Sequence, residues 1–300
     1  MAFFYFHRNP FKSTTPVDFE LKLATPDTAA IKVLSELRQS RSALIQLLPI
    51  LDQNPDRVED ALKTYLSLLY GFKPADAPTD HSKLAASVGY KWTHTMLPAA
   101  QAKSVHDVHF EIICMCQNVA FWFMKHAAKV ASSSKELSGD DMKRVHTALK
   151  KAASLLQFVE TSVLPELRER PQGGSANRDI DARLMCAYTN QCTGEAQEIT
   201  LARAVDLKHK PGLISQLANT TYQMFNTAAN AIQEMDVKVF GKWHKYLLFK
   251  AHLYLSAAYT YSGENLLSLD KCGESIRAIQ ESVKREYYFH GRSADREEFQ

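Results

Sequence analysis

The feature that most constrains this fold is a helical spacing of apolar residues in long segments that glycine and proline seldom interrupt. Between residues 104 and 131, apolar side chains recur every three or four positions, with no glycine or proline among them. This spacing places them on one face of an α-helix. The face consists of Val108, Ile112, Met115, Val119 and Phe123.

Similar patterns predict further helices, and sustained β-strand alternation is absent. We expect these helices at about 25–53, 55–70, 138–164, 180–207, 211–235 and 241–261. Residues 89–96, "GYKWTHTM", alternate as a short strand does. Residues 261–283 resemble the turn and second helix of a tetratricopeptide unit. The sequence therefore predicts an all-α fold of seven or eight antiparallel helices stacked as a solenoid.

Composition narrows the class of protein without identifying an activity. The 36 basic and 33 acidic residues nearly balance, which disfavours a nucleic-acid-binding protein. No segment approaches the roughly 18 uninterrupted apolar residues of a membrane span. The start "MAFFYFHRNPFK" lacks the basic region of a signal peptide. Four of the five cysteines lie in apolar helical stretches, as is usual for a reducing compartment. We expect a cytoplasmic protein.

The segment 196–218 predicts a helical hairpin with more apolar surface than one buried face requires. Pro211 can begin a helix but not continue one, so residues 208–211 form the turn. After it, Leu213 and Leu217 make one apolar stripe. A second stripe beside it consists of Ile214, Ala218, Thr221 and Phe225.

One stripe covers the core, and the other faces either a further helix of this chain or a partner. If Leu213 and Leu217 face a partner, both should stay accessible while Ile214 and Phe225 are buried. Residues equally far from a hairpin turn lie level, so Thr200 should lie near Leu217. The resulting apolar shelf would have basic edges, formed by Arg203 and Lys208.

Candidates for catalytic or metal chemistry are weak. His106, His109 and Cys116 share a face of the helix predicted at 104–131, which makes a helical metal-binding protein or enzyme the alternative function. The spacing matches no common zinc motif and a fourth ligand is missing, so we predict no metal. Asp140 and Asp141 fit the start of a helix better than a catalytic pair.

Other motifs point away from an enzyme. Gly173 and Gly174 lack the strand and the Lys-Ser/Thr of a phosphate-binding loop, and no Gly-x-Ser-x-Gly elbow occurs. We therefore predict no catalytic residues, no cofactor and no small-molecule substrate. The remaining charged feature is a basic segment, interpreted as a solvated face or as a surface for an acidic partner or anionic membrane. It contains Lys238, Lys242, His244, Lys245 and Lys250.

Four stretches together resemble the Bro domain family of adaptor proteins. They are "FHRNPFKSTTPV" at 6–17, "YKWTHTM" at 90–96, "AQEITLARAVDLKHKPGLISQLA" at 196–218 and "YSGENLLSLDKCGESIRAIQ" at 261–280. The resemblance implies a boomerang-shaped helical solenoid with a tetratricopeptide-like core and a small β element near the N-terminus. It also implies a non-enzymatic adaptor of the ESCRT pathway, which supports endosomal sorting or membrane remodelling.

The same resemblance implies a partner and a site. Bro domains bind the C-terminal amphipathic helix of charged multivesicular body protein 4, an ESCRT-III subunit, in a shallow apolar groove. The groove positions fall on Thr200, Leu213 and Leu217, with Lys143 on a neighbouring helix. Many relatives carry Phe where Thr200 stands, so this contact should be weaker or rearranged here. Lys143, Arg203 and Lys208 would attract an acidic helix.

The resemblance ends before the sequence does. It supports a single Bro-type domain over residues 1–300 that is incomplete at its C-terminus, with a match to about residue 283 and a divergent tail at 284–300. Similar proteins end in a Cys-a-a-X prenylation box, whereas Glu298, Phe299 and Gln300 include no cysteine. We expect recruitment to endosomal or nuclear-envelope membranes through the partner, with peripheral membrane contact.

Overall fold

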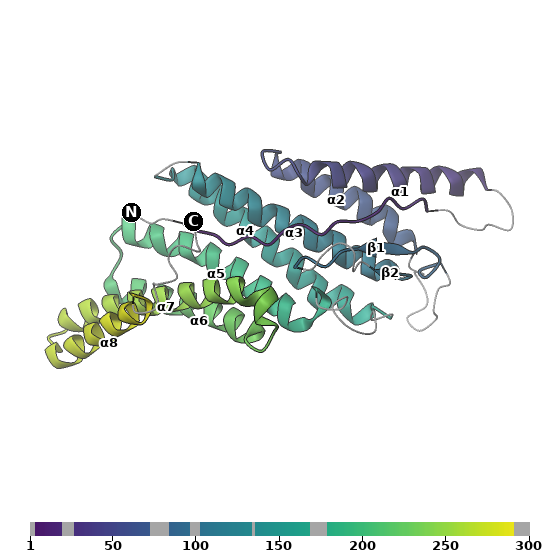
Figure 1. The fold of residues 1–300 in the computed structure, drawn as a ribbon. Helices are drawn as coiled ribbons and strands as arrows, with labels where there is room; N and C mark the ends of the chain where they lie inside the picture. Colours follow the sequence, from purple (N-terminus) through teal and green to yellow (C-terminus); the bar gives the residue numbers. More distant parts are fainter. Residues whose placement is uncertain are drawn as a thin grey trace. The chain divides into compact units, whose positions relative to one another are not determined.

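The computed structural model describes residues 4–19, 27–72, 84–96, 103–133, 136–168 and 179–290. Within these ranges the chain forms eight α-helices and one two-stranded antiparallel sheet (Figure 1). The predicted all-α class, with a small β element, is confirmed. The described residues divide into two compact units, each considered separately below.

The first unit, here the sheet unit, comprises the described residues of Arg8–Lys129 and Lys151–Met185. It contains α1 (Thr28–Leu47), α2 (Pro55–Leu69), β1 (Tyr90–Trp92), β2 (Lys103–Val105) and most of α3 (Val108–Ser132). Asp27 and Asn54 cap α1 and α2 by accepting hydrogen bonds from backbone amides two residues on. The predicted strand at 89–96 is β1, which pairs with β2, and Thr14 bridges to Trp92.

The start of α3 differs from the prediction. The apolar pattern placed it near Ser104, but residues 103–105 form β2 and the helix begins at Val108. Asp107 provides the reason, because its Oδ1 accepts a hydrogen bond from the His109 amide at 2.8 Å and caps the first turn. Residues 107–124 are all buried, so α3 is the central helix of this unit.

Helix α4 (Gly139–Phe158) confirms the helix predicted at 138–164 and explains its acidic start. The Ser138 hydroxyl accepts a hydrogen bond from the Asp141 amide and donates to the Asp141 carboxylate. This reciprocal arrangement caps the helix. A π turn (Val159–Val163) and a 3-10 turn (Leu164–Glu166) continue the chain beyond Phe158. The glycine pair at 173 and 174 lies outside the described residues.

The second unit, here the hairpin unit, comprises the described residues of Met1–His7, Val130–Lys150 and Cys186–Gln300. It contains most of α5 (Ala182–Asp206) and the whole of α6 (Pro211–Ile232), α7 (Val237–Leu267) and α8 (Cys272–His290). Helices α6, α7 and α8 follow one another as antiparallel neighbours (Figure 1). The helices predicted at 180–207 and 211–235 are confirmed within a few residues.

The prediction for α7 was too short at both ends. We expected a helix at 241–261 and a turn from residue 261, but α7 runs from Val237 to Leu267 and the turn follows it. Gly263 therefore lies inside the helix. A side chain there would meet Ile279 Cδ1 of α8 at 2.7 Å, and the Ser275 hydroxyl donates to the Gly263 carbonyl at 2.8 Å. Gly263 thus permits close packing of α8 rather than forming a turn.

Candidate partner-binding site

The candidate site begins at the tight turn between α5 and α6. The amide of Lys208 donates to the Val205 carbonyl, and the amide of His209 donates to the Ala204 carbonyl. Lys208 has a φ of 53°, so it occupies the left-handed position that closes such helix ends. Pro211 is the first residue of α6. The predicted hairpin turn at 208–211 is confirmed.

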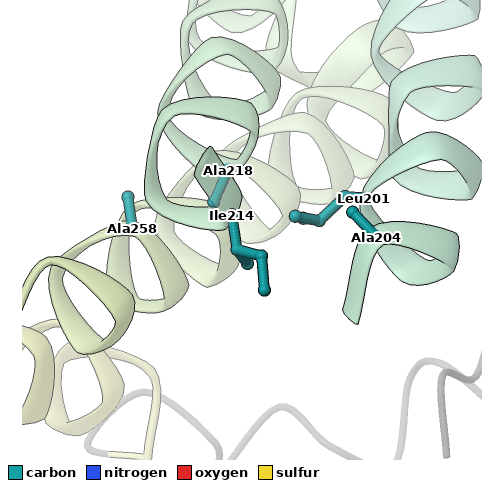
Figure 2. Close-up of a cluster of buried hydrophobic side chains, with 5 residues drawn as sticks. All are labelled: Leu201, Ala204, Ile214, Ala218 and Ala258. Atoms are coloured by element: carbon teal, nitrogen blue, oxygen red, sulfur yellow. The ribbon is translucent and has the colours of Figure 1, made fainter. Parts of the chain in front are cut away.

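An apolar cluster joins the two helices of this hairpin to α7. Its buried members are Leu201 and Ala204 from α5, Ile214 and Ala218 from α6, and Ala258 from α7 (Figure 2). The Ser215 hydroxyl donates to the Ala258 carbonyl at 2.8 Å and links α6 to α7 beside the cluster. The stripe that contains Ile214 therefore covers the core.

The other stripe stays largely accessible. Leu213 is 44% exposed, whereas Ile214 is 3% and Phe225 is 0% exposed. Leu217 is only half-buried and packs against the cluster. The exposure expected of a partner-facing stripe is thus found fully at Leu213 and partly at Leu217. An apolar side chain beside a well-packed core is a suitable anchor for an incoming helix.

The remaining predicted site residues are exposed and lie in the same unit. Thr200 and Arg203 stand on the solvent side of α5, and the neighbour of Thr200, Leu201, belongs to the apolar cluster. Lys143 is exposed on α4, and Lys208 is exposed in the turn. The structure therefore places Thr200, Arg203, Leu213 and Leu217 on one hairpin, while Lys143 comes from another helix.

The sequence analysis missed the contribution of α7. Tyr254, Ala257 and Tyr261 are partly buried and pack against the same cluster as Leu217. Their spacing of three and four residues places them on one face of α7, a signal that was available in the sequence. Burial raises the pKa of Tyr261, as does the nearby Glu264 carboxylate. These side chains add a surface from α7 to the α5–α6 hairpin at the candidate site.

A buried polar cluster holds α5 against α7 below this site. Lys250 was assigned to a solvated basic segment, but its ammonium is buried and lies 2.9 Å from the Glu198 carboxylate. That assignment was wrong for Lys250, because α5 supplies a buried carboxylate opposite it. Burial raises the pKa of Glu198 to about 7; the Lys250 ammonium opposes this shift and the Glu195 carboxylate adds to it.

The three residues of the alternative metal site do not form one. His106 precedes α3 and is exposed, so the helical spacing does not apply to it. His109 Nδ1 lies 2.8 Å from Asp107 Oδ1, and its Nε2 lies 3.0 Å from Glu166 Oε2. Cys116 is fully buried, and burial raises the pKa of its thiol to about 12. Across the described ranges, no three His, Cys, Asp or Glu side chains are grouped to hold a metal ion.

None of the helices in the described ranges combines the length and the apolar character needed to cross a bilayer. The other lysines of the basic segment, Lys238, Lys242 and Lys245, are exposed on α7.

Comparison with known proteins identifies relatives of the whole described fold. A family model for the BRO1-like domain matches residues 9–293. The chain is 41% identical over 284 residues to the human BRO1 domain-containing protein BROX, covering 93% of this chain and 67% of the relative. It is 36% identical over 293 residues to the BROX homolog of Caenorhabditis elegans, with the same two shares.

Two solved structures share the fold. An ALIX BRO1–CHMP4C complex superimposes with a TM-score of 0.74 at 18% identity, over 97% of this chain and 81% of that chain. A Bro1 domain solved to explain endosomal targeting superimposes with a TM-score of 0.69 at 20% identity, over 94% and 76%. At these identities, the comparison establishes a common fold.

Proposed function

Because this chain belongs to the BRO1-like domain family, we propose that it is a non-enzymatic ESCRT adaptor that binds the C-terminal amphipathic helix of an ESCRT-III subunit of the charged multivesicular body protein 4 type. The observation that carries this proposal is the 44% exposure of Leu213 directly beside the buried Ile214. A fold shared with an ALIX BRO1 domain in complex with CHMP4C supports the same partner class.

The apolar contacts would provide most of the affinity. An amphipathic helix presents apolar residues at intervals of three and four, and Leu213 and Leu217 have the matching spacing. Thr200 on α5 and Tyr261 on α7 would flank the bound helix. Two or three anchors contribute roughly 3–9 kcal/mol in total before the costs of association, so binding should be no tighter than micromolar. Thr200 offers less apolar surface than the Phe found in many relatives.

The basic side chains would select an acidic helix and speed its association. Lys143, Arg203 and Lys208 are exposed in the hairpin unit, as surface steering requires. Exposed charges contribute little to affinity but raise the association rate, and salt screens them. In the cell, the bound ESCRT-III subunit would recruit this protein to endosomal or nuclear-envelope membranes. Peripheral membrane contact through exposed lysines of α7 would add to that recruitment.

The test is a titration of the chain with a labelled ESCRT-III tail peptide, followed by anisotropy. Leu213→Asp places an unpaired charge where an apolar anchor should dock, so affinity should fall by about thirtyfold or more, a loss above roughly 2 kcal/mol. Thermal stability should barely change, since Leu213 is largely exposed. Leu217→Asp should also weaken binding, but it will destabilise the fold because Leu217 packs on the cluster.

The matched control is Ile50→Asp, because Ile50 is 48% exposed in the sheet unit. It should bind the peptide as the unchanged chain does. If Leu213→Asp folds and binds normally, the binding surface lies elsewhere and the site assignment is wrong.

Lys143→Ala should weaken binding only about two- to fivefold at low salt, and this difference should shrink as the salt concentration rises. Lys63→Ala serves as its control, since Lys63 is an exposed lysine of the sheet unit paired with Glu59 on the same helix. An effect of Lys143→Ala that is independent of salt would contradict the steering role.

A further inference from the structure

One half-buried side chain beside the proposed partner site has hydrogen-bonding groups that the chain does not use. No described residue makes a hydrogen bond with the Gln197 carboxamide of α5. By contrast, the Gln191 carboxamide, earlier on the same helix, donates to the His7 carbonyl and the Glu195 carboxylate and accepts from the Trp243 indole. A carboxamide has two donor hydrogens and an acceptor oxygen. Gln197 can therefore bond an incoming molecule without breaking a bond within the chain.

Gln197 lies on the same side of the α5–α6 hairpin as Leu213 and Leu217. Three side chains of α6 that keep exposed surface each precede a buried residue of that helix by one position. These pairs are Leu213 and Ile214, Leu217 and Ala218, and Met224 and Phe225. On α5, Thr200 precedes the buried Leu201 in the same way.

One residue turns a helix by about 100°, and in an antiparallel pair equal offsets turn both sets of side chains to the same side of the pair. Gln197 precedes Leu201 by four residues, which turns it about 40° in that same direction. Its carboxamide therefore lies between Thr200 and the line along which α5 and α6 pack.

Gln197 also lies between apolar side chains along the length of the hairpin. A side chain added to Gly194 of α5 would meet the Phe225 ring of α6 at 3.1 Å, so these two residues are neighbours across the hairpin. Gln197 is three residues nearer the turn than Gly194. The matching level of α6, three residues nearer the turn than Phe225, falls between Leu217 and Met224.

The apolar line of α6 is interrupted near that level. One turn after Leu217 stand Thr220 and Thr221, whose hydroxyls donate to carbonyls of their own helix at 3.0 and 2.8 Å. Thr221 is buried, and Thr220 is exposed. The site therefore offers apolar surface at Leu217, then a polar position at Gln197, then apolar surface again at Met224.

We propose that Gln197 selects the partner helix by pairing with a carboxamide side chain of that helix, placed between the residues that pack on Leu217 and Met224. This inference rests on the proposed function, whose site it extends. Two carboxamides satisfy each other, because each supplies a donor and an acceptor. A carboxylate would lose its water beside two apolar side chains, which costs more than for an amide. A leucine would leave Gln197 covered and unpaired, so a purely apolar helix is rejected.

Titration with the labelled ESCRT-III tail peptide tests the proposal through the sign of one effect. Gln197→Leu should weaken binding about five- to tenfold, because the carboxamide of the bound helix loses its partner. A site that recognises apolar surface alone predicts tighter binding, since leucine enlarges that surface. The melting temperature should not fall, because the Gln197 carboxamide bonds no described residue. Gln39→Leu, at an exposed position of α1, is the matched control and should leave binding unchanged.

The outcome also separates this proposal from the proposed function. If Leu213→Asp abolishes binding but Gln197→Leu leaves it unchanged or tighter, the partner site is correct and the selective role of Gln197 is wrong. If the unchanged chain does not bind the peptide, the proposed function fails, and the role of Gln197 fails with it.

Peptide variants identify the paired side chain. Each Asn or Gln of the tail peptide is replaced singly by Leu, and each Asp or Glu singly by Ala, and every variant is titrated against the unchanged chain and against Gln197→Leu. One Asn or Gln replacement should weaken binding to the unchanged chain about five- to tenfold but cost Gln197→Leu less than twofold. Coupling at an acidic residue instead, or at no residue, would overturn the carboxamide pairing.

Discussion

Each of the two units buries glutamate on a helix, but the two compensate its charge differently. In the sheet unit, Glu111 of α3 is fully buried and each of its oxygens is bonded. Its Oε1 accepts hydrogen bonds from Arg41 Nε and the Tyr65 hydroxyl, both at 2.8 Å. Its Oε2 accepts one from Trp92 Nε1 at 2.6 Å. One carboxylate here has one guanidinium and two further donors.

In the hairpin unit, two carboxylates are buried one turn apart on α5, and Lys250 pairs with one of them. Glu195 Oε1 accepts hydrogen bonds from Gln191 Nε2 and the Tyr246 hydroxyl, both at 2.8 Å. Glu198, one turn further along α5, pairs with the buried Lys250. Both carboxylates are buried, and the Glu195 carboxylate adds to the effect of burial in raising the pKa of Glu198.

The difference teaches that burial alone does not decide how a charged cluster behaves. A buried carboxylate with a matched cation and two further donors depends on that cation, because removing it leaves an unpaired buried charge. Burial together with a second carboxylate nearby makes ionisation costly, and a carboxylate in that setting takes up a proton at higher pH. The stability of the sheet unit should therefore depend on an intact ion pair, and the stability of the hairpin unit should depend on pH.

Arg41→Met should give the largest effect. It leaves Glu111 buried without its cation, so the free energy of unfolding should fall by about 3–5 kcal/mol. Denaturant titration at neutral pH measures this loss. Arg38→Met on the same helix is the control, because the Arg38 guanidinium donates to the Asp18 carbonyl at an exposed site. It should cost under about 1 kcal/mol. If Arg41→Met and Arg38→Met lowered the free energy of unfolding equally, the buried ion pair would not be what the sheet unit depends on.

The second prediction concerns pH. The pKa of Glu198 is about 7 in the folded protein, above its ordinary 4.5, so the folded state binds this proton more readily than the unfolded chain. The resulting stabilisation is fully present below about pH 4.5 and is lost as the pH rises through 7. Its total is on the order of 3 kcal/mol. Hydrogen exchange of α5 and α7 amides across this range measures it, and Glu198→Gln should flatten the profile.

The stability of the sheet unit should respond to pH in the opposite direction. Burial acts to raise the pKa of Asp107, but hydrogen bonds from His109 and the Arg168 amide outweigh it and hold the pKa below its usual value. The stability contributed by Asp107 is therefore present above about pH 4 and lost in stronger acid. Amides at the start of α3 should show this loss. Parallel pH profiles in both units would contradict the comparison.

Lys250→Met should give the smallest effect. It removes the ammonium that pairs with Glu198, but Glu198 can then stay protonated, so the loss should be roughly 1–2 kcal/mol at neutral pH. The pH at which stability is lost should also move upwards, because Lys250 opposes the raised pKa of Glu198. Lys245→Met, at an exposed position of α7, is the control. A loss as large as that of Arg41→Met would show that Glu198 cannot neutralise itself.

Sequence reasoning succeeded where the signal is local. Apolar periodicity located the helices, and Pro211 with the preceding Lys208 located the α5–α6 turn. It failed where a distant segment competes for the same residues. Ser104 continues an apolar helical pattern, yet Tyr90–Trp92 recruits residues 103–105 into a sheet. Gly263 is typical of a turn, yet the packing of α8 keeps it inside α7.

The candidate site, too, was predictable from the sequence only in part. Two apolar stripes on residues 213–225 were evident from the sequence, as was the hairpin that carries them. Only the tertiary structure decided that Ile214 faces the cluster and Leu213 does not, and that Leu217 is shared between core and surface. Whether Leu213 and its neighbours bind a partner stays a prediction for the titration above.

The sequence by itself determined the helical class, the α5–α6 turn and the amphipathic faces, because periodicity and capping depend on residues close together in the chain. The tertiary structure decided which apolar face is covered, why Lys250 is buried and His106 is not, and that Lys250 pairs with a buried carboxylate of α5. Exposure and charge depend on side chains contributed by distant segments, such as Glu198 opposite Lys250, which no local pattern encodes.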